Sequence, residues 1–296
     1  MKKDKLLGLF LLVVLLVGLG AMGTRILLPE SQGTESCLSD TINKTRVIEE
    51  AASAKESLDP YWWLNSGAYL YIKDGIAHSI LGQLPEKDKW RYRYFESKPE
   101  TTLNGYRPQN IFRLITRKKW RNVSQEVYFQ ITDYDPAPHE ARNQSNALLL
   151  FSRYIDSDNL YYAGLRVDGA AVIKKKLAGT YYTLGMIPVI DGQYDRDTNP
   201  ILLPYNKWIG EKFVVRTLPD DTVLLELYLD LEGSGEWEQV LSIIDVDGAQ
   251  GPLVLRDAAY GGIRTDFMDI FIKKYIICEL KDDSEAMIDR QALDEG

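Results

Sequence analysis

Short runs of alternating apolar and polar residues fill most of the chain from residue 61 onward, with Gly, Asp, Asn and Pro between them. Successive side chains of a strand point to opposite faces, so a period of two is typical of strands with one buried face. The pattern predicts strands at Ala68–Lys73, Ile76–Leu81, Trp90–Phe95, Ile111–Arg117, Gln125–Asp133, Ala147–Arg153, Leu160–Val167, Ala171–Lys176, Lys212–Thr217, Val223–Leu231, Glu238–Ile244, Leu253–Leu255 and Phe267–Cys278. So many strands require two packed antiparallel sheets, because a single open sheet would leave an apolar face bare.

Two aspartate-glycine pairs mark the turns between neighbouring strands. Asp74-Gly75 separates the first two predicted strands, and Asp168-Gly169 separates Leu160–Val167 from Ala171–Lys176. This dipeptide suits the tight turns of β-hairpins, since both residues tolerate positive φ angles. We therefore expect two hairpins at these positions.

The N-terminus has a different pattern. Three lysines in the first five residues precede an unbroken apolar run over residues 6–23, which is typical of an export signal. Ala21-Met22-Gly23 offers a cleavage site, while the run is also long enough to remain as a transmembrane anchor. Both fates stay open, and either places the body of the protein outside the cytoplasm, secreted or anchored at the cell surface.

The rest of the chain divides into three segments. We expect residues 24–58 to be a linker with a short helix at Thr45–Ser57, because Val47, Ala51 and Ala54 fall on one helical side. Residues 59–280 form the sandwich domain, and residues 281–296 form an acidic tail. The expected fold class is thus all-β, a two-sheet antiparallel sandwich preceded by a signal or transmembrane helix and a linker.

The net charge argues against one class of partner, and the two cysteines allow a disulfide. The formal net charge of −8 disfavours nucleic acid as a partner, because phosphate backbones bind basic surfaces. Cys37 and Cys278 are the two cysteines of the chain. An oxidising compartment would permit a disulfide between them, and two independent thiols are the alternative.

Two segments carry a resemblance to a known superfamily. They are Phe151–Tyr162 with Gly164, Asp168-Gly169, Lys174–Lys176 and Gly179, and the later Gly261–Phe271. The first resembles the central hairpins of concanavalin A-like lectin and glucanase domains, and the second is similar to their last strands. The resemblance implies a jelly-roll sandwich, and a polysaccharide or other glycan as partner, without naming a reaction.

A glycan-binding module is the first functional hypothesis, since aromatic rings stack on sugars while basic and amide side chains bind hydroxyls or carboxylates. Strand alternation predicts that the candidate ligand-binding residues share a basic, aromatic face: Arg113, Arg117, Arg153, Tyr162, Arg166, Lys174 and Lys176. The alternative is an ordinary solvated sheet face. Binding of this kind requires no cofactor.

Enzymatic and protein-binding functions are the alternatives. A polysaccharide lyase needs groups that neutralise a uronate and move a proton, for which Arg113, Tyr128 and Gln130 are the catalytic candidates. The Gln-x-His motif of alginate lyases is absent, as is the Glu-x-Asp-x-x-Glu motif that retaining glucanases use. A surface domain that binds protein, as laminin-G-like domains do, is the third hypothesis.

A calcium site is also predicted. Asp195, Asp197 and Asn199 follow the pattern Asp-x-Asp-x-Asn, whose oxygen ligands suit a hard cation such as Ca²⁺. Pro200 stands where an EF-hand loop has glycine. An ordinary acidic loop is the alternative interpretation.

Overall fold

The computed structural model describes residues 34–39, 41–135 and 139–281. The export signal expected at residues 1–23 lies outside these ranges, as does the expected acidic tail except for Lys281. Among the described residues, no helix is both long and apolar enough to cross a bilayer.

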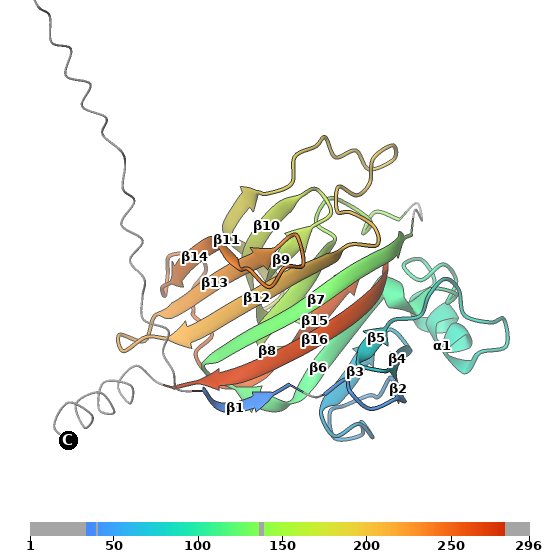
Figure 1. Ribbon diagram of the computed structural model, residues 1–296, viewed down its shortest axis with the longest axis horizontal. Coiled ribbons are helices and arrows are strands. Elements are labelled where there is room, and N and C mark those ends of the chain that lie inside the picture. Colours follow the sequence, from blue (N-terminus) through green and yellow to red (C-terminus); the bar gives the residue numbers. More distant parts are fainter. Residues whose placement is uncertain (1–33, 40, 136–138, 282–296) are drawn as a thin grey trace, which may run out of the picture. The chain divides into compact units, whose positions relative to one another are not determined.

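The described residues form two antiparallel sheets, sheet A and sheet B, packed face to face (Figure 1). The order of strands in sheet A is β14 (Glu238–Asp245), β13 (Val223–Asp230), β12 (Trp208–Thr217), β7 (Val123–Tyr134), β16 (Met268–Leu280), β5 (Ile76–His78), β4 (Tyr69–Lys73) and β2 (Arg46–Glu49), with β1 (Thr34–Leu38) also paired to β16. The order in sheet B is β11 (Thr180–Pro188), β10 (Ala170–Leu177), β9 (Asn159–Arg166), β8 (Ala147–Asp156), β15 (Ala259–Asp266), β6 (Ile111–Trp120) and β3 (Trp62–Ser66). This confirms the predicted all-β, two-sheet antiparallel sandwich.

The main hydrophobic core lies between the two sheets. Val127 and Phe129 of β7 face it from sheet A, and Phe112 and Leu114 of β6 face it from sheet B; all four are buried. Burial of each such side chain contributes roughly 1.5–3 kcal/mol. Residues between them in sequence point to the outer faces of the sheets, where a ligand can reach them.

Both aspartate-glycine hairpins are present. Asp74 and Gly75 have φ angles of 51° and 79°, as a primed turn requires, and they connect β4 to β5. Gly169, with φ 79°, closes the turn between β9 and β10 and donates a backbone hydrogen bond to the carbonyl of Arg166.

The prediction that residues 24–58 form a linker is wrong from residue 34 onward. The expected helix at Thr45–Ser57 is instead the strand β2, which pairs with β4, followed by turns. Val47 and Ile48 are β-branched neighbours that favour a strand, and this preference outweighs the helical spacing of Val47 and Ala51. With β1 also in sheet A, the sandwich begins well before residue 59.

Two predicted strands are not strands. Residues 90–95 belong to the helix α1 (Lys89–Ser97), whose N-cap Asp88 accepts a hydrogen bond from the backbone of Trp90. Trp90 and Tyr94, four residues apart, form its buried side, so the aromatic alternation was misleading. Leu253–Leu255 is irregular, and a short helix η1 (Pro108–Asn110) precedes β6.

Cys37 of β1 and Cys278 of β16 form a disulfide. They are direct register partners across the antiparallel pair, with Cα atoms 4.1 Å apart. The bond connects the two ends of the described chain and attaches β1 to the centre of sheet A.

Candidate functional site on the outer face of sheet B

The outer face of sheet B has a hydrophobic cluster of its own, separate from the main core. Its members are each less than 10% exposed: Ile115, Ala147, Leu149, Phe151, Tyr154, Leu160 and Tyr162. Strands β8 and β9 are consequently buried on both faces along most of their length. Their outward side chains pack on one another and form an apolar and aromatic floor.

Basic side chains stand around this floor. Six of the seven residues predicted from sequence to bind ligand belong to this face: Arg113, Arg117, Tyr162, Arg166, Lys174 and Lys176. The sequence interpretation missed Arg264 of β15, which lies between Ile263 and Thr265, two buried residues that face inward. Strict alternation within that strand would have found it.

Tyr162 lies at the centre of the face. Its register partners are Phe151 on β8 and Lys174 on β10, and its ring meets that of Tyr181 edge-on at 6.2 Å. Burial, and next the neighbouring Tyr181, raise the pKa of the Tyr162 phenol. The phenol therefore stays protonated at physiological pH and can donate a hydrogen bond.

Two arginines of the face are held by carboxylates two residues further along the chain. Arg166 donates to Asp168 at 2.6 Å, and Arg264 donates to Asp266 through both Nε and Nη2 at 3.0 and 2.9 Å. The nearby carboxylate of Asp266 raises the pKa of Arg264 further above its ordinary range. These pairs fix the guanidinium groups in place on the face.

Arg113 on β6 is the direct register partner of Arg264 on β15 and is held by neutral groups. It donates to the side chain of Asn65 at 3.2 Å, and its guanidinium lies 5.8 Å from the centre of the Tyr154 ring. Lys176 pairs with Asp158 at 2.8 Å, and Arg117 donates to the carbonyl of Asp59.

The seventh predicted binding residue, Arg153, lies inside the protein. A bulge in β8 gives it a φ of 51° and turns its side chain away from the outer face. Its guanidinium donates to the carbonyl of Leu255 at 3.1 Å and to the hydroxyl of Thr217 at 3.0 Å, and burial lowers its pKa to about 10. Assigning Arg153 to the ligand-binding face was therefore wrong.

The three catalytic candidates do not meet. Arg113 points outward from sheet B, whereas Tyr128 and Gln130 point outward from sheet A, on the opposite side of the sandwich. Tyr128 donates to Asp230 at 2.9 Å, and Gln130 donates to the carbonyl of Asn206. The arrangement that a lyase mechanism would need from these residues is therefore absent.

The predicted calcium ligands form a self-contained turn. One carboxylate oxygen of Asp195 accepts hydrogen bonds from the backbone of Asp197 and from the backbone and hydroxyl of Thr198. The Asn199 amide donates to the carbonyl of Gln193. Nowhere in the described ranges do three or more His, Cys, Asp or Glu side chains gather as metal ligands would.

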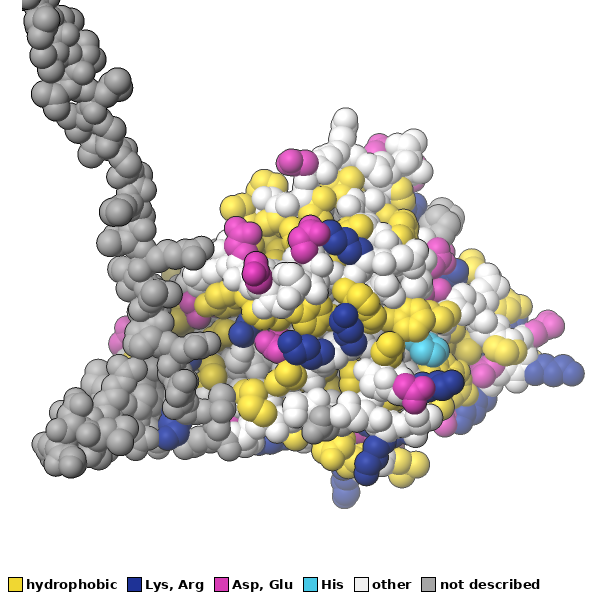
Figure 2. Space-filling view, in the orientation of Figure 1, with side chains coloured by type: hydrophobic (Ala, Val, Ile, Leu, Met, Phe, Trp, Pro, Cys, Tyr) yellow, Lys and Arg dark blue, Asp and Glu magenta, His cyan; other side chains and the backbone are white. Residues whose placement is uncertain are grey.

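Cations also lie over aromatic rings on the outer face of sheet A. Figure 2 views the sandwich from this side and shows basic side chains among hydrophobic ones over the middle strands. Lys273 lies 4.3 Å from the centre of the Trp208 ring, and Lys212 lies 5.6 Å from that of Trp237. On sheet B, Lys176 likewise lies 4.8 Å from the centre of the Tyr181 ring, so contacts between cations and rings do not distinguish the two faces. The aromatic cluster around Tyr162 is what distinguishes the outer face of sheet B.

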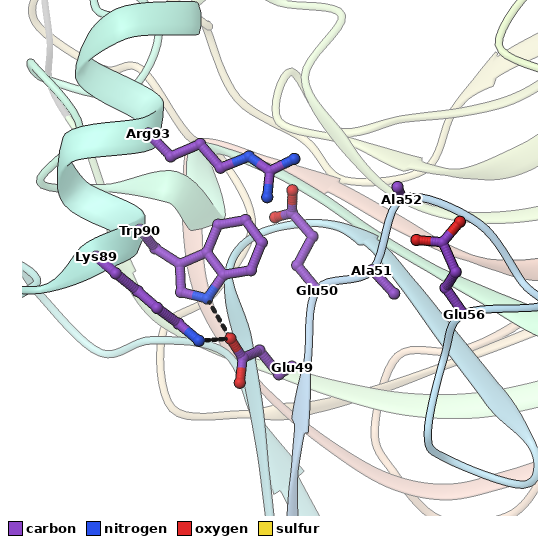
Figure 3. Close-up of a pocket in the computed structure, with 8 residues that line it drawn as sticks. All are labelled: Glu49, Glu50, Ala51, Ala52, Glu56, Lys89, Trp90 and Arg93. Carbon is purple, nitrogen blue, oxygen red and sulfur yellow. Dashed lines mark hydrogen bonds and ion pairs between the residues drawn. The ribbon is translucent and has the colours of Figure 1, made fainter.

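A pocket of about 540 Å³ lies between α1 and the residues that follow β2 (Figure 3). Glu49 accepts hydrogen bonds from the Trp90 indole, and Glu50 accepts from the hydroxyl of Tyr94 at 2.5 Å. Burial raises the pKa of Glu50. The guanidinium of Arg93 lies 4.9 Å from the centre of the Trp90 ring. These contacts attach α1 to the sandwich, and the carboxylates of Glu49 and Glu50 already have donors of the protein's own.

Comparisons with known proteins give distant structural similarity. Neither a protein-family model nor a curated protein sequence matches the chain. The carbohydrate binding module CBM66 from Bacillus subtilis is 10% identical, with 82% of this chain and 95% of that one covered and a TM-score of 0.38. A Bacillus subtilis protein with a galectin-like fold is 9% identical over 83% and 97%, with a TM-score of 0.43, and the Bacillus licheniformis beta-glucanase is 6% identical over 84% and 100%, with a TM-score of 0.41. At these values, function is inferred from the chain's own residues.

Proposed function

We propose that this protein is a glycan-binding module that holds a polysaccharide on the outer face of sheet B. The observation that carries the proposal is the aromatic floor around Tyr162, surrounded by the basic side chains of Arg113, Arg166, Lys174 and Arg264. Aromatic rings supply stacking surface for sugar rings, and fixed cationic donors bind hydroxyl or carboxylate oxygens.

The proposal concerns binding and not catalysis, because the residues that sequence analysis offered for a lyase lie on opposite faces. Binding needs one continuous surface. A reaction would additionally need an acid and a base within hydrogen-bonding reach of one sugar. The outer face of sheet B supplies that continuous surface.

Tyr181 gives a direct test, since it borders the Tyr162 ring and is 51% exposed. Tyr181→Ala should weaken polysaccharide binding by roughly five- to tenfold, the value of one aromatic contact. Tyr205→Ala, at a tyrosine of 46% exposure whose nearest strand is β7 of sheet A, is the matched control. Binding is screened on a glycan array and measured by isothermal titration calorimetry; equal losses in both variants would contradict the proposal.

We further propose that the module acts outside the cytoplasm, secreted or anchored at the cell surface. The lysine-led apolar run over residues 6–23 and the Cys37–Cys278 disulfide support this location. Cell fractionation of the full-length protein, with protease added to intact cells, is the test. Protection of the sandwich from that protease would contradict an external location.

A further inference from the structure

We propose that the outer face of sheet B binds an anionic glycan, with Lys174, Arg264 and Tyr162 donating to a carboxylate or sulfate on one sugar ring. This inference rests on the proposed function and adds the chemical class of the ligand. It is carried by three hydrogen-bond donors on adjacent parts of one face that the protein leaves unused.

The charge of the face is opposite to that of the protein. The chain has a formal net charge of −8, yet basic side chains on this face outnumber acidic ones. The cations are Arg113, Arg117, Lys119, Arg166, Lys174, Lys176 and Arg264, and the carboxylates that pair with them are Asp158, Asp168 and Asp266. A local excess of positive charge attracts an anionic sugar more strongly than a neutral one.

Lys174 has no hydrogen bond or ion pair with any described residue, although its side chain is partly buried. It lies between Tyr162 on β9 and Thr183 on β11. Burial, and next the positive charge of Arg166, lower its pKa. Asp168 acts on Lys174 in the opposite direction, but its carboxylate is bound by Arg166. Lys174 therefore lacks an ion pair, which a bound carboxylate or sulfate would supply.

The neighbouring donors complete the site. Arg264 donates to Asp266 through Nε and Nη2, so its Nη1 has no described partner. The Arg264 side chain is 33% exposed. The Tyr162 hydroxyl likewise has no hydrogen bond to a described residue, while electrostatic coupling of Tyr162 with both Arg264 and Arg166 places the three groups close together. Strand β10 lies roughly 14 Å from β15, three strand spacings away. Lys174 is also two residues out of register with Arg264, so the two long side chains would reach an anion from opposite sides of Tyr162.

Arg166 has a supporting role. Its Nε donates to the carbonyl of Gln144, its Nη2 to Asp168, and its Nη1 lies 3.1 Å from the sulfur of Met186. With all three nitrogens engaged, Arg166 contributes positive potential and leaves direct contact to Lys174 and Arg264.

The test compares polysaccharides that differ only in charge. Polygalacturonate is set against its methyl-esterified form, and dextran sulfate against dextran, which also separates carboxylate from sulfate as the source of the anion. At low salt, at least one anionic form should bind the full-length protein roughly tenfold more tightly than its neutral counterpart, and added salt should reduce that preference.

Three variants test whether Lys174 causes the preference for the anionic polysaccharide. Lys174→Gln should remove most of the charge preference, while Lys174→Arg should keep it. Lys212→Gln, at a strand lysine beside an aromatic ring on the outer face of sheet A, should leave affinity unchanged. Circular dichroism and thermal melting establish that each variant is folded.

The possible outcomes test the anionic site separately from glycan binding. If neutral and anionic forms bind equally, or if Lys174→Gln keeps the full preference, the anionic site is wrong while glycan binding stands. If no polysaccharide of either charge binds here or on the array, both are wrong.

Discussion

The ammonium of Lys175 and the carboxylate of Asp245 form an ion pair between the two sheets, 2.8 Å apart, with neither side chain exposed to solvent. Lys175 belongs to β10 of sheet B, and Asp245 is the last residue of β14 of sheet A. The Tyr161 hydroxyl donates to the same carboxylate at 2.5 Å, and Lys175 also donates to the carbonyl of Leu253. The pair therefore links the two sheets. Side-chain alternation along β10 places Lys175 between the sheets and its neighbour Lys174 on the outer face of sheet B.

Removing one partner of this pair should destabilise the fold strongly. Lys175→Met leaves the Asp245 carboxylate buried without a counter-ion, and we expect a loss of about 3–5 kcal/mol in the free energy of unfolding. The double variant Lys175→Met with Asp245→Asn should recover much of that loss, because the amide oxygen still accepts from Tyr161. Urea unfolding measures both; a double variant no more stable than the single one would show that the charge is not what matters.

Glu211 should make stability depend on pH. Its side chain is fully buried between the sheets, where one carboxylate oxygen accepts from the backbone of Leu165 at 3.0 Å and the other has no partner. Burial raises its pKa well above the ordinary value of 4.5. The stability that protonated Glu211 contributes is fully present below pH 4.5, and it is lost as pH rises through the folded-state pKa.

Glu211→Gln removes this dependence. The variant should equal the wild type near pH 4 and exceed it at pH 8 by about 1 kcal/mol or more, since one pKa unit corresponds to about 1.4 kcal/mol. The measurement is the difference between the two proteins in urea unfolding across this range. A difference that does not change with pH would exclude titration of Glu211.

The disulfide should supply a large part of the stability. Cys37 and Cys278 are 241 residues apart in sequence, so the bond restricts the unfolded chain over nearly the whole domain. Reduction, or Cys37→Ser with Cys278→Ser, should cost about 2–5 kcal/mol. Thermal melting with and without reductant measures the loss, with the serine double variant as a control that should not respond to reductant. An unchanged melting temperature on reduction of the wild type would contradict the prediction.

Alternation within a strand could be predicted from the sequence, and pairing between strands could not. Tyr162, Arg166 and Lys174 were correctly placed on one face because each strand has a period of two and a hairpin joins the two strands. Strands β6 and β7 are separated by only two residues, as in a hairpin, yet they belong to different sheets. Arg113 and Tyr128 were for this reason expected together and lie on opposite sides.

Local deviations account for the other differences. The bulge at Arg153 reverses the direction of one side chain, and nothing in the composition of Phe151–Tyr154 signals it. The buried side of α1 comes from Trp90 and Tyr94, which fit a helical face as well as an alternating strand. In both cases the tertiary environment decided between two local conformations that the sequence allows.

Binding of an anionic glycan should weaken with rising pH because of Lys174. Burial, and next the adjacent Arg166, lower the pKa of Lys174, while Tyr181 and Asp168 act in the opposite direction without cancelling them. The free ammonium therefore loses its proton at a lower pH than an ordinary lysine, and affinity should fall as pH passes its pKa. Lys174→Arg should hold its affinity to higher pH, because a guanidinium stays charged there. Since a bound anion raises the pKa of Lys174, calorimetry in buffers of different ionisation heats should also detect proton uptake near that pH. Identical pH profiles for wild type and Lys174→Arg would show that Lys174 does not contact the anion.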